Sequence, residues 1–296
     1  MKTKNATGPV RAGSVKKTSL AKRNIEKLMR NKVAVAGFLI IAVIILSCVL
    51  APLLTSWDPM GASLRTRGLP PSGEHLLGTD KLGRDVFSRL LYGGRYSILI
   101  SLSGAIGGVG IGIILGCIAG YFGGWFDRLM VKVSEVFQSV PQIMLVLVLV
   151  VFLSQSITNL ILIFVFTGWV GSFRMVRGRF FSLREENFVD SCKAFGIGSA
   201  SIMYQHILPN TLGPVTVQIT LACAGYILQE AALSFLGLGV PSDVPTWGNI
   251  LNGAREVATV TKYPWIWLAP GIVISLFVLG VNFLGDGLRD VLDPNQ

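Results

Sequence analysis

Few side chains in this sequence could carry out acid–base, nucleophilic or metal chemistry. The 296 residues include only 2 histidines, which is a poor supply of groups for general acid–base catalysis. No Gly-Lys pair is present for a phosphate-binding loop, and neither HExxH nor GxSxG occurs. The four cysteines (Cys48, Cys117, Cys192 and Cys223) are far apart and include no CxxC pair. The sequence therefore predicts no enzyme, no bound metal and no nucleotide or cofactor site in this chain.

Three polar side chains within apolar stretches are candidates for contact with a transported solute. Gln138 precedes the apolar run at 143–153, and Gln229 and Glu230 lie in the apolar stretch at 210–236. An acidic residue inside a membrane span is costly and is a functional hypothesis by default. The alternative for Glu230 is a structural carboxylate near the outer membrane surface that pairs with an arginine or reaches water. We therefore expect all three to line a translocation path, with the structural role still open for Glu230.

A polar segment at 190–209, DSCKAFGIGSASIMYQHILP, interrupts the apolar runs. Asp190 near the start of a short helix would interact favourably with the helix dipole. Gly196 and Gly198 predict a turn with positive φ, residues 200–207 are amphipathic, and Pro209 is expected to end that second stretch. A short helix of this kind suits a groove on a partner protein, although a plain connector between spans is the alternative.

The polar residues described above are separated by long apolar runs, and the helices that these runs form must hold them in place. Hydrophobic residues make up 51% of the chain and charged residues 14%, whereas soluble domains carry about 25% charged residues. Runs of about 20 apolar residues predict membrane-spanning helices. We expect an all-α membrane protein with six transmembrane helices, at 33–54, 95–118, 129–153, 157–176, 210–236 and 264–285. Pro141 is expected to kink the third of them.

Basic residues predict the orientation in the membrane. The tail at 1–32 carries ten Lys or Arg against one acidic residue. It contains no aromatic residues on which bases could stack, so we expect it to bind anionic membrane lipid rather than nucleic acid. Of the 26 Lys and Arg, 18 fall on the same side as this tail, so both termini are expected in the cytoplasm. The expected parts are a basic cytoplasmic tail (1–32), the first helix (33–54), an extracytoplasmic segment (55–94), a core domain (95–285) with a cytoplasmic loop (177–209) and an outer loop (237–263), and a cytoplasmic C-terminus (286–296).

Glycines recur every four residues in the second expected span. On a helix, residues four apart share one face, so these glycines form a flat stripe that lets another helix approach closely. A dinucleotide-binding fingerprint is excluded because a membrane span offers no strand–turn–helix context. We expect helix packing at Gly104, Gly108, Gly112, Gly116 and Gly120.

The segment at 190–209 resembles the cytoplasmic "EAA" loop of bacterial ABC importer permeases. Asp190 stands for the Glu of that motif, Ser191 and Cys192 for its two Ala, and His206 for its Ile. Gly196 and the closing pair Leu208-Pro209 keep the motif's spacing. Further stretches at 75–99, 230–240, 245–248 and 282–294 are similar to the "C" permease subunit of dipeptide, oligopeptide and nickel importers, and together they cover most of 33–294.

The resemblance implies a bacterial or archaeal cytoplasmic-membrane protein with a core of five helices, as in other type I ABC importer permeases. It implies contact with ATPase subunits through Asp190, Ser191, Cys192, Ala194, Phe195, Gly196, His206, Leu208 and Pro209. The implied partners are a second, homologous permease, a pair of ATPases that bind ATP and Mg, and an extracytoplasmic substrate-binding protein. Import of di- or oligopeptides is the expected function. Nickel or another small solute is an alternative, and a membrane scaffold that moves no solute is an alternative of another class.

Overall fold

The long apolar runs of the chain form helices, because backbone polar groups in a lipid bilayer must be satisfied within the segment itself. The computed structural model describes residues 27–292. In that range helices dominate, and β pairing is limited to an isolated bridge between Thr79 and Asp85. The predicted all-α class is therefore confirmed. The elements are α2 (Lys32–Val49), α3 (Ala51–Leu54), η1 (Leu64–Thr66), α4 (Val86–Phe122), α5 (Gly124–Ser139), α6 (Gln142–Phe152), α7 (Ile157–Leu183), α8 (Asn187–Ala194), α9 (Ser199–Ser201), the π-helical η2 (Ile202–Ile207), η3 (Leu208–Thr211), α10 (Leu212–Phe235), α11 (Trp247–Asn252), α12 (Val257–Lys262) and α13 (Trp265–Leu292).

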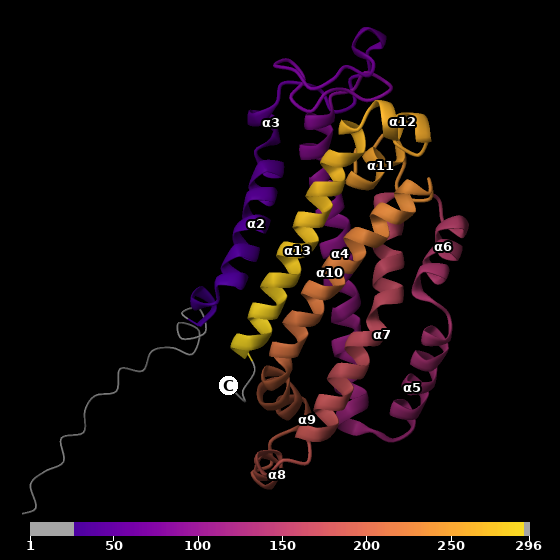
Figure 1. Ribbon diagram of the computed structural model, residues 1–296. Coiled ribbons are helices and arrows are strands. Elements are labelled where there is room, and N and C mark those ends of the chain that lie inside the picture. The colour runs from indigo at the N-terminus through magenta and orange to yellow at the C-terminus, as the bar shows by residue number, and fades with distance from the viewer. Residues whose placement is uncertain (1–26, 293–296) are drawn as a thin grey trace, which may run out of the picture.

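Five helices in the described range are long and apolar enough to cross a membrane: α2, α4, α7, the helix that runs from α9 through α10, and α13. The helices α5 and α6, which meet at a bend of 86°, make a sixth crossing if the pair is counted as one span. On that count, the six predicted spans correspond to five long helices and one broken pair. Figure 1 shows them side by side, with the loop at 55–85, α11 and α12 at one end and α8 and α9 at the other. We refer to these as the α12 end and the α8 end.

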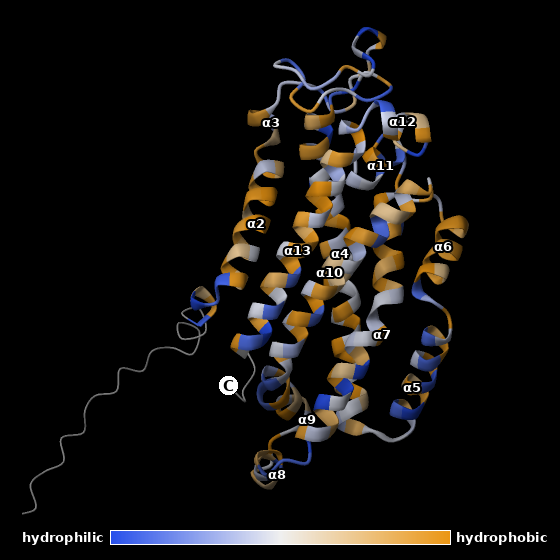
Figure 2. Ribbon diagram, in the orientation of Figure 1, coloured by the Kyte–Doolittle hydropathy of each residue, from blue (hydrophilic) through white to orange (hydrophobic). Residues whose placement is uncertain are grey.

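Apolar side chains cover the sides of the bundle. Figure 2 shows hydrophobic residues along α2 and α6 and more hydrophilic ones on α5 and in the loops at both ends. On α2, Phe38, Leu39 and Val43 are 57%, 55% and 65% exposed. Such a surface would be unfavourable in water but suits the acyl chains of a bilayer.

Several helices extend past the predicted spans, because hydropathy marks the apolar length whereas capping sets where a helix begins. α4 begins at Val86 rather than at 95, since the Asp85 carboxylate accepts a hydrogen bond from Ser88 N (2.7 Å) and caps the helix. α7 continues to Leu183 and α13 to Leu292, past the predicted span ends at 176 and 285. The basic tail up to residue 26 lies outside the described residues.

The third predicted span is broken at its proline. α5 ends at Ser139, Val140 and Pro141 are extended, and α6 begins at Gln142 with Pro141 as its N-cap. Proline is disfavoured inside a helix because it lacks an N–H and clashes with the preceding turn, and it is tolerated at a helix start. The predicted bend at Pro141 is confirmed, in the form of a full break.

The most extensive helix contact in the described structure joins α4 and α7. The five glycines of the predicted stripe lie on the α4 face that meets α7. A Cβ added at Gly112 would lie 2.5 Å from Trp169 O and 2.7 Å from Phe173 N, and one added at Gly116 would lie 2.9 Å from Phe173 O. These distances leave no room for a side chain, so the contact depends on glycine.

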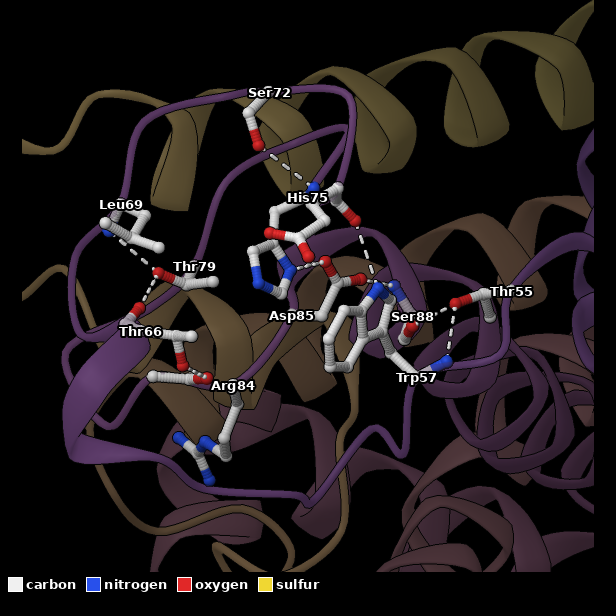
Figure 3. Close-up of polar contacts among 12 residues, drawn as sticks. Thr55, Trp57, Thr66, Leu69, Ser72, His75, Thr79, Arg84, Asp85 and Ser88 are labelled. Atoms are coloured by element: carbon white, nitrogen blue, oxygen red, sulfur yellow. Dashed lines mark hydrogen bonds and ion pairs between the residues drawn. The ribbon is translucent and has the colours of Figure 1, made fainter.

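A buried pair, His75 and Asp85, organises the loop at the α12 end (Figure 3). His75 Nδ1 lies 2.9 Å from Asp85 Oδ1, and the two side chains are 2% and 3% exposed. The Trp57 ring packs on the His75 ring with centroids 4.6 Å apart, and Trp57 Nε1 donates a hydrogen bond to Glu74 O (3.0 Å). Because Asp85 also caps α4, this pair fixes the loop to the start of that helix.

The same loop is tied to the C-terminal part of the chain. Lys81 Nζ donates to Glu256 Oε2 (2.6 Å), and this hydrogen bond lowers the pKa of Glu256 below its usual value. Trp265 Nε1, at the start of α13, donates to Thr79 O (3.1 Å). Exposed ion pairs contribute little to stability, so the tryptophan contact is the more important of the two.

We expect Gly112→Ala to destabilise the protein by about 1–3 kcal/mol, because the added methyl group would overlap the α7 backbone and force the helices apart. The midpoint of thermal unfolding of the purified protein in detergent measures the loss.

Gly110→Ala is the matched control on the same helix. A Cβ at Gly110 meets nothing within 4 Å, and alanine is the better helix former by about 1 kcal/mol, so the midpoint should be unchanged or slightly raised. Equal effects of the two substitutions would contradict a glycine-dependent α4–α7 contact.

Candidate functional site

The segment at the α8 end begins with the short helix α8. Asp190 lies in its first turn and Lys193 in its last, each at the end of the helix where the dipole favours its charge. Their side chains form a pair at 3.0 Å and are 66% and 51% exposed. Because exposed pairs of this kind are worth at most about 1 kcal/mol, both side chains are available to a partner.

A Schellman turn ends α8. Gly196 N–H donates to Lys193 O (2.9 Å) and Ile197 N–H donates to Cys192 O (3.0 Å), which is the hydrogen-bond pair of that motif. Gly196 has φ +72°, a conformation that side chains oppose. Gly198 has φ −66°, so the expectation of a positive φ there was wrong. One glycine suffices because the motif needs a single left-handed residue.

An apolar inner face anchors the segment to the bundle. Val189, Ile202 and Ile207 are buried and belong to one cluster with Val176 and Phe180 of α7. The segment is therefore packed against the end of α7.

The outer face of the segment is exposed and aromatic. Phe195 is 86% exposed and Tyr204 is 72% exposed, and Ser191 and Ala194 are exposed beside them. Large exposed aromatic residues rimmed by polar ones are typical of protein contact sites. Of the residues implied to contact ATPases, Asp190, Ser191, Cys192, Ala194, Phe195 and Gly196 lie on α8 and its turn, while His206, Leu208 and Pro209 lie on η2 and η3.

Pro209 does not end the second stretch, contrary to expectation. The chain stays helical from Ser199 to Phe235, through a π-helical turn at η2 and a tighter turn at η3. Pro209 lies at the start of η3, where the change of helix type accommodates its missing N–H. The surface segment and α10 are thus one continuous helical path.

A cavity of about 520 Å³ lies between the end of α7, α8 and η2–η3. His206 and Pro209 belong to its lining, together with Arg179, Leu183, Glu186, Phe188, Gln205 and Asn210. A concave surface with mixed charges thus lies next to the exposed aromatic residues.

A larger cavity, of about 790 Å³, lies between α7, α10 and the α5–α6 break. Gln138 and Gln229, two of the three residues predicted to line a path, border it. Gln142, Gln218 and Tyr226 also border it and were not predicted from sequence. Gln218 and Tyr226 lie far from Gln138 along the chain, and Gln142 follows Gln138 by four residues but lies beyond the break at Pro141. Gln218 lies eleven residues before Gln229, which is close to a whole number of helical turns at about 3.6 residues per turn, so this spacing was the available signal.

Glu230 lies outside this cavity. Its side chain is fully buried and accepts hydrogen bonds from Ser234 Oγ (2.8 Å) and Ser97 Oγ (3.2 Å). Ser97 Oγ in turn accepts from Trp247 N (3.1 Å) at the start of α11. The structure therefore places Glu230 at the junction of α4, α10 and α11. The structural alternative had suggested an arginine as its partner, whereas the observed partners are serine hydroxyls.

These features describe a multi-pass helical membrane protein with an exposed aromatic segment at one end and a polar cavity among its helices. Comparison with known families identifies the class of protein. Residues 112–296 match the family described as binding-protein-dependent transport system inner membrane component. Residues 19–71 match the N-terminal TM domain of oligopeptide transport permease C.

Curated relatives align over nearly the whole chain. The oligopeptide transport system permease protein OppC of Bacillus subtilis is 36% identical over 281 residues, covering 95% of this chain and 92% of the relative. The dipeptide transport system permease protein DppC of Alkalihalophilus pseudofirmus is 41% identical over 271 residues, covering 92% and 88%. DppC of Bacillus subtilis is 37% identical over 285 residues, covering 96% and 89%. The chain belongs to the family of binding-protein-dependent transport permeases, the inner-membrane subunits of such systems.

We expect Glu230→Ala to destabilise the protein by roughly 3 kcal/mol, because it removes the acceptor of the Ser97 and Ser234 hydroxyls and opens a cavity. Glu230→Gln keeps the shape and an acceptor and should restore most of the loss. Thermal unfolding in detergent measures both.

Gln229→Ala, the neighbouring residue on the cavity wall, serves as control and should change the unfolding midpoint little. A Glu230→Ala protein of unchanged stability but altered solute preference would instead place Glu230 on the path.

Proposed function

We propose that this chain is the transmembrane permease subunit of an ATP-driven importer of di- and oligopeptides and forms half of its translocation path. The observation that carries this proposal is the set of oligopeptide and dipeptide permeases that align over 92–96% of this chain at 36–41% identity. The exposed helical segment at the α8 end and the polar cavity supply the two surfaces that such a subunit needs.

The proposed ATPase contact is the α8 end. The partner ATPases bind ATP and Mg and supply the energy, since the sequence of this chain contains no phosphate-binding loop. Their groove would receive α8 and the exposed Phe195 and Tyr204, in the helix-in-groove mode. The α8 end would then face the cytoplasm, in agreement with the basic residues Arg177, Arg179 and Arg184 near it.

The coupling follows from the continuity of the helix. Because Ser199–Phe235 is one helical path, displacement of the surface segment is transmitted to α10 without an intervening flexible loop. α10 carries Gln218, Tyr226 and Gln229 on the cavity wall. A push at the α8 end would therefore move one wall of the cavity and rock the subunit between inward-open and outward-open states.

The α12 end would face the substrate-binding protein. The loop at 55–85 and α11–α12 form a single surface there, because Lys81 bonds to Glu256 and Trp265 bonds to Thr79. A second, homologous permease would complete the path on the open side of the cavity, between the α5–α6 break and α10.

We expect Gly196→Ser to lower peptide uptake by the reconstituted transporter at least fivefold. Serine disfavours the left-handed conformation by about 1–2 kcal/mol, which would disturb the Schellman turn that shapes the docking surface. Assembly of the complex should persist, because a Cβ added at Gly196 would meet no other atom of this chain within 4 Å. ATP-dependent uptake of a labelled peptide into proteoliposomes measures the effect.

Gly198→Ser is the matched control in the same turn. Gly198 has φ −66° and serine is a favourable N-cap residue, so uptake should stay near the wild-type level. Normal uptake by a fully assembled Gly196→Ser transporter would refute the coupling role. Uptake of Ni²⁺ but of no peptide by the wild-type transporter would refute the peptide assignment.

A further inference from the structure

The cavity between α7, α10 and the α5–α6 break is polar without being charged. None of its lining side chains, within the part of the chain that the structure describes, is Asp, Glu, Lys, Arg or His. Its hydrogen-bonding side chains are four glutamines, Thr167 and Tyr226. A passage for water or ions does not require such uniform amide chemistry, so the glutamines need an explanation of their own.

The two hydroxyl groups of the cavity are already engaged. Thr167 Oγ1 donates to Ile163 O (2.8 Å) and the Tyr226 hydroxyl donates to Phe164 O (3.2 Å), both on α7. They stabilise the wall itself. The remaining capacity for hydrogen bonding to a solute therefore lies with the glutamines.

The glutamine amides face the cavity from two sides. Gln138 and Gln142 flank the α5–α6 break, and Gln218 and Gln229 lie on α10. Among the described residues, the Gln138, Gln218 and Gln229 side chains bond to no other side chain or backbone group; the Gln142 amide lies beside the Tyr226 hydroxyl. Each amide offers a carbonyl acceptor and an NH₂ donor.

Glycines keep the wall open around these amides. A Cβ at Gly225 would meet nothing within 4 Å, and one at Gly171 would lie 3.2 Å from Gln218 Nε2. The absence of side chains at both positions leaves the Gln218 amide accessible from the cavity.

The spacing on α10 suits an extended chain. Gln218 and Gln229 are eleven residues apart, which places them on one face about 16 Å apart along the helix. An extended peptide covers about 3.3–3.6 Å per residue, so the two amides span a stretch of about five residues.

We propose that Gln138, Gln142, Gln218 and Gln229 bind the main chain of the transported peptide through amide hydrogen bonds and, being neutral, pass peptides of either side-chain charge. A peptide bond presents one donor and one acceptor at every residue whatever its side chain, which matches the donor and acceptor of glutamine. Charged groups in the wall would favour one class of peptide, since opposite charges attract and like charges repel strongly at low dielectric. This inference rests on the proposed function and assigns the residues that set its selectivity.

The test uses the complete transporter with its binding protein in proteoliposomes, and a pair of labelled tripeptides, Ala-Lys-Ala and Ala-Glu-Ala. The readout is the ratio of their uptake rates, normalised to the wild-type ratio so that the preference of the binding protein cancels. We expect Gln229→Glu to shift the ratio at least tenfold toward the lysine peptide, and Gln229→Lys to shift it at least tenfold toward the glutamate peptide. Gln218→Glu and Gln218→Lys should act in the same two directions.

Gln155→Glu introduces the same charge outside this cavity, in the exposed turn between α6 and α7. It should leave the ratio at the wild-type value even if overall uptake falls. A ratio that does not move in the Gln218 and Gln229 variants, or that moves in the same direction for Glu and Lys, overturns the assignment while peptide import itself stands. Failure of the wild-type transporter to import either peptide would instead overturn the proposed function.

Discussion

Contact of α4 with α7 along the glycine stripe is the constraint on which the rest of the bundle depends. Apolar side chains gain little by leaving lipid, so close van der Waals packing has to hold membrane helices together. Glycine allows that approach at Gly112 and Gly116, where a Cβ would overlap the α7 backbone. The contact fixes α7, which in turn carries the α8 segment at one end and a wall of the large cavity along its length.

In the proposed transporter, two structural features would let a partner drive this frame. The buried cluster of Val189, Ile202 and Ile207 joins the α8 segment to the end of α7. The uninterrupted helix from Ser199 to Phe235 joins the same segment to α10 and to the glutamines of the cavity. At the opposite end, Glu230 and Ser97 tie α10 and α4 to α11, so buried polar contacts hold the α12 end together.

Much of the fold could be predicted from the sequence, because the apolar runs and the four-residue glycine spacing follow from the physics of the bilayer. Helix ends could not: α4 begins at Val86 because Asp85 caps it and binds His75, a contact ten residues apart that hydropathy cannot register. Pro209 was expected to stop a helix, but a change to π-helical and tighter turns absorbs it.

The candidate site was predictable in part. The motif at 190–209 marked the surface segment, and polarity marked Gln138 and Gln229. Gln142 and Gln218 come to the same cavity only through the break at Pro141 and the packing of α10 beside α7, which are tertiary features. Glu230 was expected to line the path because a carboxylate is rare in an apolar run. In the structure it lies outside the large cavity, and its hydrogen bonds are to buried hydroxyl groups.

Cross-linking from the exposed Phe195 position most directly tests whether energy enters this subunit through the α8 segment. A photo-activatable amino acid replaces Phe195 in the transporter purified with its partners, and a second placement at Leu39 on the exposed face of α2 serves as control. The account predicts a covalent adduct between position 195 and an ATPase subunit, changing in yield when ATP binds, and none from position 39. An intact complex in which position 195 forms no ATPase adduct would contradict it.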